Sequence, residues 1–345
     1  RRLGVDMGDG PTEDQAVRRC LDHLQSAEAG DRLVVFDNVE RIEDVAGVVP
    51  RGGGLRVVAT TRSGRGWRAQ GWERVDVGVF PREDSIAYLL DATDSRDEEA
   101  ADAVAGRLGD LPLAVAQAAA TASDEEWTLR RYLERLGEYS SEQVIRPVPG
   151  DSYTRDVSRA LLLAVDSALD RIEGGLREVA RCQVGALAVL AESGVPTRWI
   201  DPRAEDNKAT EGADESNEDT GAAGAGEDAD ARAAAAESAH LALTALLNAS
   251  VVQQSADGGV TMLHRLQGRV LRENWNQGER AEAFDAAADL LDRVDIDSLP
   301  RKDTEGRRRE TLDFIDQLRA IAAQGYSRPL FECERVVAGL PHVLL

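Results

Sequence analysis

The stretch from Arg32 to Glu40, R-L-V-V-F-D-N-V-E, constrains the fold of this chain most strongly. Its four apolar residues, Leu33 to Phe36, are too few for a helix and are rich in β-branched and aromatic side chains. They predict a strand that is buried on both faces of a parallel sheet. Asp37 and Asn38 follow at once. Because ligands bind at the carboxyl ends of strands in open α/β sheets, Asp37 is predicted to face a site. The alternative is an ordinary turn after a strand, which is equally common.

The segments around this strand predict an alternation of helices and strands. Residues 12–26 have the apolar spacing of an amphipathic helix, and residues 42–49 suggest a short one. A second buried strand is predicted at 55–60 and a weaker third strand at 73–79. Strands that alternate with helices indicate a parallel, doubly wound sheet.

Arg62 follows the second predicted strand, at the same edge of the sheet as Asp37. An arginine in this place can bind a terminal phosphate and stabilise the charge that develops during phosphoryl transfer. The alternative is a solvated loop arginine beside Arg65 and Arg68.

From residue 81 onwards the pattern predicts helices only. The sequence L-G-D-L-P-L-A at 108–114 ends one helix at a Gly turn and begins the next with Pro112 near its first position. The helices expected in this part of the chain cover residues 82–91, 97–108, 111–122 and 127–136.

Three motifs in this order resemble those of the NB-ARC family, which are signal-transducing NTPases of the STAND class. F-D-N-V-E at 36–40 resembles the Walker-B motif, A-T-T-R at 59–62 the sensor-1 arginine, and L-G-D-L-P-L-A the GLPL motif. The resemblance implies that Asp37 holds the Mg²⁺ of bound ATP and that Arg62 senses the γ-phosphate. It also implies that Pro112 and Leu113 contribute to the adenine pocket.

Asn38 stands where many members of that family carry a second acid, the candidate catalytic base. An amide cannot accept a proton from water. The intact protein is therefore expected to be a slow ATPase, and this chain alone to be inactive.

The second half of the chain fits the same resemblance. Apolar-periodic helices are predicted at 157–169, 176–190 and 240–247, and a hairpin is predicted around the turn at 255–259. Helices that precede a terminal hairpin predict a winged-helix domain.

L-H-R-L-Q at 263–267 follows the hairpin and resembles the family's MHD motif. The resemblance implies that His264 contacts the β-phosphate of ADP and closes the inactive state. Arg265 stands where that motif has Asp, so the contacts made by the acid are not implied here. The alternative is that His264 only caps the following helix.

The predicted fold class is α/β plus all-α. A partial doubly wound parallel sheet of the P-loop NTPase type is expected at 1–80, a helical ARC1-like domain at 81–145, and a winged-helix ARC2-like domain at 150–275. A helical connector is expected at 276–345. The acidic segment 202–236 has almost no large apolar residue and is predicted to be a disordered insertion. L-P-H-V at 340–343 resembles the stretch from which bacterial NB-ARC proteins continue into tetratricopeptide repeats.

The sequence contains no G-x-x-x-x-G-K-[ST], the loop that binds nucleotide phosphates through its backbone and its lysine. The lysines of the chain are Lys208, in the acidic segment, and Lys302, which lies far from any glycine-rich loop. In the family this loop precedes the helix expected at 12–26. We therefore expect the chain to be the C-terminal part of a longer module, and ATP or ADP with Mg²⁺ to bind only when the upstream loop is present.

Composition limits the partners. A net charge of −22 disfavours a nucleic-acid surface, which needs clustered cations. No apolar run approaches the roughly 20 residues that span a membrane. Three widely spaced cysteines without metal-ligand spacing indicate reduced thiols and a cytoplasmic location.

Three functions remain after these exclusions. The first is a nucleotide-dependent switch that binds protein partners and forms a homo-oligomer. The second is a nucleotide-free protein–protein scaffold, and the third is the NB-ARC part of a transcriptional regulator. Nucleotide binding would separate the first from the second.

Overall fold

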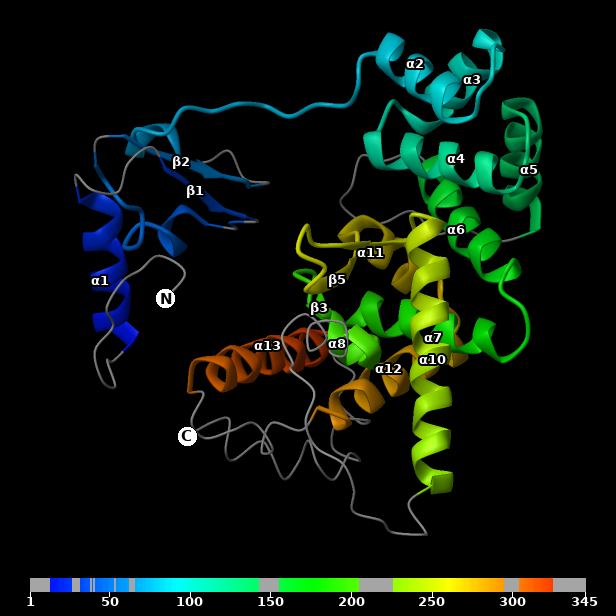
Figure 1. The fold of residues 1–345 in the computed structure, drawn as a ribbon. Helices are drawn as coiled ribbons and strands as arrows, with labels where there is room; N and C mark the ends of the chain where they lie inside the picture. Colours follow the sequence, from blue (N-terminus) through cyan, green and yellow to red (C-terminus); the bar gives the residue numbers. More distant parts are fainter. Residues whose placement is uncertain are drawn as a thin grey trace, which may run out of the picture. The chain divides into compact units, whose positions relative to one another are not determined.

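The computed structural model divides the chain into two compact units, Arg1–Gly78 and Val79–Leu345, whose elements are shown in Figure 1. Each unit is considered by itself. The structure describes residues 13–26, 32–37, 39, 41–52, 54–61, 66–142, 155–204, 226–294 and 304–324.

The first unit contains a parallel pair of strands. It begins with helix α1 (Glu13–Gln25), and strands β1 (Arg32–Phe36) and β2 (Leu55–Ala59) then pair in parallel, with Arg32 opposite Leu55 and Phe36 opposite Ala59. The described part of the unit also contains two short 3₁₀ helices, η2 (Ile42–Asp44) and η3 (Arg68–Gln70). The predicted helix at 42–49 is thus shortened to η2 and a following turn.

Among the described residues, an apolar cluster covers one face of this sheet. Phe36 and Ala59 pack on a small buried cluster of Val39, Ile42, Val45 and Trp67. On the opposite face Leu33 is 60% exposed and Val35 is 55% exposed. The prediction that β1 is buried on both faces is therefore wrong. A parallel sheet is buried on both sides only when packed elements cover both, and the β1–β2 connection supplies its apolar residues to one side.

The third strand predicted at 73–79 is also absent from the described part of the first unit. Residues 72–80 have no regular structure, although Val75, Val77 and Val79 alternate as they would in a strand. Val77 is 95% exposed. Alternation indicates a strand only when a neighbouring strand accepts the backbone hydrogen bonds, and none of the described strands pairs with this segment. The described sheet is therefore a parallel pair, and the doubly wound sheet remains a prediction.

The second unit begins with four helices at the positions expected from the sequence: α2 (Arg82–Ala92), α3 (Glu98–Leu108), α4 (Pro112–Asp124) and α5 (Leu129–Glu142). The side chain of Asp97 caps α3 by accepting a 3.1 Å hydrogen bond from the Ala100 N–H. Gly109, at φ +61°, ends α3, and Pro112 takes the first position of α4.

A small antiparallel sheet with helices follows. Its strands, β3 (Val195–Pro196), β4 (Val252–Gln254) and β5 (Val260–Leu263), lie in the order β3-β5-β4. Strands β4 and β5 form the predicted hairpin, in which Val252 lies opposite Leu263. The helices of this part are α6 (Arg155–Asp170), α7 (Gly175–Val189), α8 (Thr197–Ile200), the 3₁₀ helix η4 (Pro202–Ala204), α10 (Gly226–Asn248) and α11 (Arg265–Asn274).

Helix α10 is longer than predicted. It begins at Gly226, so its first turns lie in the segment expected to be disordered, while residues 205–225 lie outside the described residues. Residues 230–235 are exposed and include a run of alanines. Alanine has the highest helix propensity, and extending an existing helix adds a hydrogen bond for each ordered residue. Extension from the packed second half of α10 therefore compensates for the lack of apolar burial.

Two further helices are described in the second unit, α12 (Gln277–Asp292) and α13 (Thr304–Ala323). A single buried apolar cluster extends from α2 to α13. Its fully buried large side chains include Tyr132, Leu161, Leu246, Phe284 and Ile321. The helical part, the small sheet and the last helix therefore share one core. Within the described ranges, no helix has the length and apolarity needed to cross a membrane.

Candidate functional site

Asp37 lies where the sequence predicts it, directly after β1 and at the carboxyl end of the parallel pair. The hydroxyl of Thr60, which directly follows β2, donates a 2.5 Å hydrogen bond to Oδ1 of Asp37. Backbone bonds hold the two ends together, because the Thr60 N–H donates to the Phe36 carbonyl at 2.9 Å and the Val39 N–H to the Thr60 carbonyl at 2.8 Å. The exposed Asp37 carboxylate is thereby oriented at the sheet edge.

Thr60 was not among the residues predicted for this site. The signal was present in A-T-T-R, where the first threonine follows the strand at the same level as Asp37 in a parallel register. Carboxylate and hydroxyl oxygens are ligands suited to Mg²⁺, which usually completes its shell with water and phosphate oxygens. Within the described ranges, no group of three or more His, Cys, Asp or Glu side chains could hold a metal ion. Asp37 and Thr60 would therefore need a bound phosphate to complete such a site.

Two predicted residues of the first unit, Asn38 and Arg62, lie outside the described residues. The remaining predicted residues, Pro112, Leu113 and His264, belong to the second unit. The structure brings Asp37 together with Thr60 and places Pro112 beside Leu113 in one helical turn. His264 lies at the start of a different helix.

Pro112 and Leu113 begin α4 after a tight turn. Both are half-buried, and Leu113 packs against the main core of the unit. Before them, Gly109 and Asp110 both have positive φ angles, +61° and +55°. The guanidinium of Arg82 holds the pKa of the Asp110 carboxyl below its usual range. This turn is thus fixed by a charged contact that the sequence pattern did not reveal.

His264 caps α11. Its Nδ1 accepts a 3.2 Å hydrogen bond from the Leu266 N–H. Burial lowers the pKa of His264, Arg265 lowers it further, and Glu192 opposes this shift. An imidazole that accepts at Nδ1 and is neutral carries its proton on Nε2. His264 therefore caps α11, and its Nε2–H is left as a donor for another acceptor.

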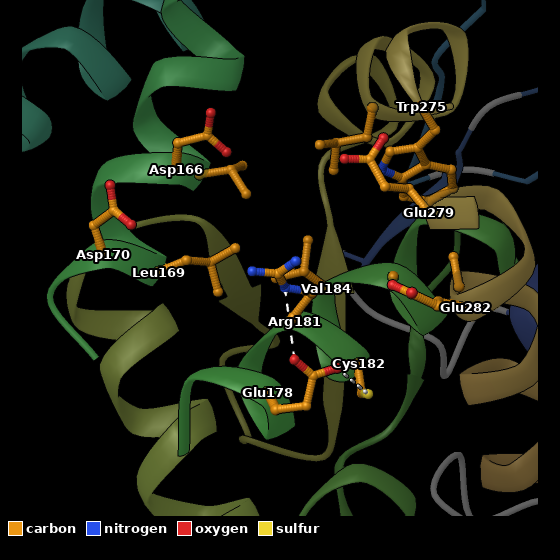
Figure 2. A pocket seen from close by; sticks show the side chains of 14 residues that line it. Asp166, Leu169, Asp170, Glu178, Arg181, Cys182, Val184, Trp275, Glu279 and Glu282 are labelled. Carbon is orange, nitrogen blue, oxygen red and sulfur yellow. Dashed lines mark hydrogen bonds and ion pairs between the residues drawn. The ribbon is translucent and has the colours of Figure 1, made fainter. Parts of the chain in front are cut away.

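A cavity of about 350 Å³ lies between α6, α7, α11 and α12 (Figure 2). Val184, Leu271 and Trp275 form apolar parts of its wall. Five carboxylates and one arginine also line it: Asp166, Asp170, Glu178, Glu279, Glu282 and Arg181. Figure 2 shows Asp166 and Asp170 on one side, Trp275 and Glu279 on the other, and Arg181 between them. This excess of negative charge repels phosphate groups, and none of the predicted site residues lines the cavity.

Cys182 also lines the cavity, and its Sγ lies 4.0 Å from Oε1 of Glu178. Burial raises the pKa of the Cys182 thiol, and the charges of Glu178, Glu282 and Asp289 raise it further. A thiol with a raised pKa is a poor nucleophile at neutral pH.

Comparison with protein-family models gave no match, and neither did comparison with curated proteins.

Proposed function

We propose that this chain is part of a nucleotide-dependent switch of the NB-ARC type, which binds ADP and ATP with Mg²⁺. The observation that carries the proposal is the contact between Asp37 and Thr60, at the carboxyl ends of two parallel strands. Nucleotides bind at this edge in parallel α/β sheets. The order of the three sequence motifs supports the same function.

In this proposal Asp37 and Thr60 hold the Mg²⁺ that accompanies the nucleotide, and Arg62 contacts the γ-phosphate. Mg²⁺ would neutralise phosphate charge at this edge. Thr60 keeps the Asp37 carboxylate pointing to the metal through its hydroxyl hydrogen bond. Asn38 provides no base at its position, so hydrolysis is slow, as suits a switch.

His264 would donate from Nε2 to the β-phosphate of ADP in the closed state, while Nδ1 keeps its capping bond. Burial favours the neutral imidazole, which donates from Nε2 without losing the cap. Pro112 and Leu113, both half-buried, would contact the adenine from the start of α4.

We further propose the domain assignment that goes with this function. The strand order β3-β5-β4, with α7, α8 and α10 before the hairpin, supports a winged-helix domain at 150–275. Helices α2 to α5 form the ARC1-like domain at 81–145, and 276–345 is the connector towards tetratricopeptide repeats. The protein would act in the cytoplasm through protein partners and a homo-oligomer.

Calorimetry with ADP and ATP in Mg²⁺ buffer tests the switch, on this chain and on one lengthened upstream through a phosphate-loop unit. Variant His264→Asn keeps a capping side chain but loses the Nε2–H donor. We expect this variant to bind ADP about tenfold more weakly, which is the loss expected for one charge-assisted hydrogen bond. Its affinity for ATP should fall much less. Variant His240→Asn is the control. Equal losses for both nucleotides would exclude the closing role of His264, and no binding by either chain would exclude the switch.

The second candidate, a nucleotide-free scaffold, is favoured by Asn38, which stands where the family carries a second acid and cannot accept a proton from water. Failure of both chains to bind nucleotide would favour it. The transcription-regulator alternative gains no support from the exposed part of α10, residues 230–235, which is alanine-rich instead of basic.

A further inference from the structure

Arg82 makes an unusually complete set of contacts for a residue that is not part of the core. It is the first residue of α2 and follows the irregular segment 72–80. Its Nε and Nη2 each lie 2.8 Å from one oxygen of Asp110, so the pair is two-pronged. Its Nη1 donates to Oδ1 of Asp102 at 3.0 Å. A guanidinium bound in this way is fixed in direction as well as in distance.

Asp110 is the strained residue of the turn that precedes Pro112. Its φ of +55° is a conformation that non-glycine residues adopt at a cost of about 1–2 kcal/mol. Its backbone carbonyl accepts a 3.0 Å hydrogen bond from the Phe80 N–H. Asp110 is thus bound through its main chain to Phe80 and through its side chain to Arg82.

These contacts join two parts of the chain that are distant in sequence. On one side is the end of the segment that leads from the first unit into the second. On the other is the turn that determines where α4 begins. Residues 80 and 82 cannot move away from Asp110 without losing hydrogen bonds that water would only partly replace.

We infer that Arg82 and Asp110 are positioning residues that couple the Pro112 turn to residues 79–82, where the chain enters the second unit. Given the nucleotide site proposed above, on which this consequence rests, they couple adenine contact at Pro112 and Leu113 to the connection between the units. The coupling itself is a property of the chain without ligand. A nucleobase that moves the Pro112 turn then also moves residues 79–82. Movement of residues 79–82 likewise moves the Pro112 turn.

The exposure of the pair indicates that its effect is local. The Arg82 side chain is 43% exposed and the Asp110 side chain 14%. Partly exposed ion pairs contribute little to global stability, and helices α2 to α4 are held together by buried Leu89, Val104 and Val115. Breaking the pair should therefore loosen the turn and leave the core folded.

Two variants and a matched control isolate the coupling. Asp110→Asn keeps a residue that tolerates positive φ but removes the carboxylate. Arg82→Lys keeps the positive charge but removes the guanidinium that makes the two-pronged contact. The control is Arg130→Lys, because Arg130 makes a similar two-pronged contact with Asp97, at 2.6 and 3.1 Å. That contact lies at the start of α3, and no contact links it to residue 80 or 110.

Amide hydrogen exchange of the chain is the first measurement. We expect Asp110→Asn to speed exchange at Phe80, and Arg82→Lys to speed exchange at Leu111, each about three- to tenfold. Arg130→Lys should change neither. Unchanged exchange at Phe80 in Asp110→Asn would overturn the coupling. A uniform loss of protection across α2 to α4 would also overturn it, because it would indicate a purely structural role.

The second measurement is the ratio of ADP to GDP affinity in whichever chain binds nucleotide. We expect Arg82→Lys to lower this ratio about threefold, while His264→Asn weakens both diphosphates alike. A changed exchange pattern with an unchanged ratio would overturn the role of Arg82 in base contact. If no chain binds nucleotide, the proposed function fails, and the exchange result alone decides the coupling.

Discussion

His264 shows how one side chain can have two separable roles. Its Nδ1 satisfies a backbone N–H at the start of α11, and this role depends on the neutral imidazole. Protonation of Nδ1 would turn the acceptor into a donor and break the cap. Burial disfavours that protonation. The cap and the proposed phosphate contact therefore both require the same tautomer.

The lowered pKa of His264 gives a pH dependence of stability. In the unfolded chain the His264 imidazole has a pKa near 6.5, and in the folded chain its pKa is lower. Protons therefore favour the unfolded state in this window, and the contribution of His264 to stability is lost as the pH falls below about 6.5. We expect the Tm of wild type to fall more between pH 7 and pH 5 than the Tm of His264→Asn. Parallel pH profiles would contradict this.

The thiol of Cys182 should react slowly. Only the thiolate is alkylated, and burial together with Glu178, Glu282 and Asp289 raises the thiol pKa. We expect iodoacetamide at pH 8 to label Cys182 more slowly than it labels free N-acetylcysteine. Glu282→Gln should speed the reaction about two- to threefold by removing one negative charge. Mass spectrometry measures the rate, and Cys182→Ser identifies the labelled peptide. Labelling as fast as the free thiol would refute the raised pKa.

At the scale of elements, the small sheet depends on one glycine. Gly194 precedes β3 at φ +88°, and a Cβ there would lie 2.7 Å from the Thr261 carbonyl oxygen and 2.9 Å from the Met262 Cβ. Residues 194 and 261–262 are neighbours only because β3 pairs with β5. The close approach of these two strands thus requires a residue without a side chain.

We expect Gly194→Ala to destabilise the second unit by about 2–4 kcal/mol, from positive φ and overpacking together. Gly258→Ala is the matched control, because Gly258 also has a positive φ, +66°, but its Cβ would meet nothing within 4 Å. The control should cost only about 1 kcal/mol. Urea denaturation followed by circular dichroism measures both. Equal losses would show that conformation alone, and not strand packing, determines the effect.

At the scale of the whole molecule, α13 is part of the second unit's core. Gln317, 1% exposed, accepts a 2.7 Å hydrogen bond from the Ala191 N–H and donates one of 2.9 Å to the Gly194 carbonyl. Trp199 contacts Phe314 edge to face, and its Nε1 donates to Glu310. The last described helix thus satisfies backbone groups next to the small sheet.

Gln317→Leu should therefore destabilise the whole unit and not merely release α13. It leaves the buried Gly194 carbonyl and the partly buried Ala191 N–H without their partner, at about 1–3 kcal/mol each. We expect a single thermal transition of the second unit, shifted to lower temperature by the same amount whether circular dichroism or tryptophan fluorescence follows it. Leu312→Ala, an exposed position of α13, should change stability by less than about 0.5 kcal/mol. Separate transitions by the two probes would show that α13 unfolds independently.

The sequence by itself determined features that depend on neighbours along the chain. Caps, periodicity and turn residues located α3, α4 and the β4–β5 hairpin, and the abrupt end of an apolar run located Asp37 at the edge of the sheet. Such signals act within a few residues and can be read directly. For the same reason the sequence predicted a cap at His264 as one alternative.

Only the tertiary structure decided what lies across the fold. The hydrogen bond from Thr60 to Asp37 depends on the register of the two strands. The contact of Arg82 with Asp110 depends on how the helices pack. The exposed face of β1 and the unpaired segment 73–79 depend on which elements are available to cover them. Burial and strand pairing each depend on two segments that are distant in sequence. A local pattern such as alternating valines describes only one of those two segments.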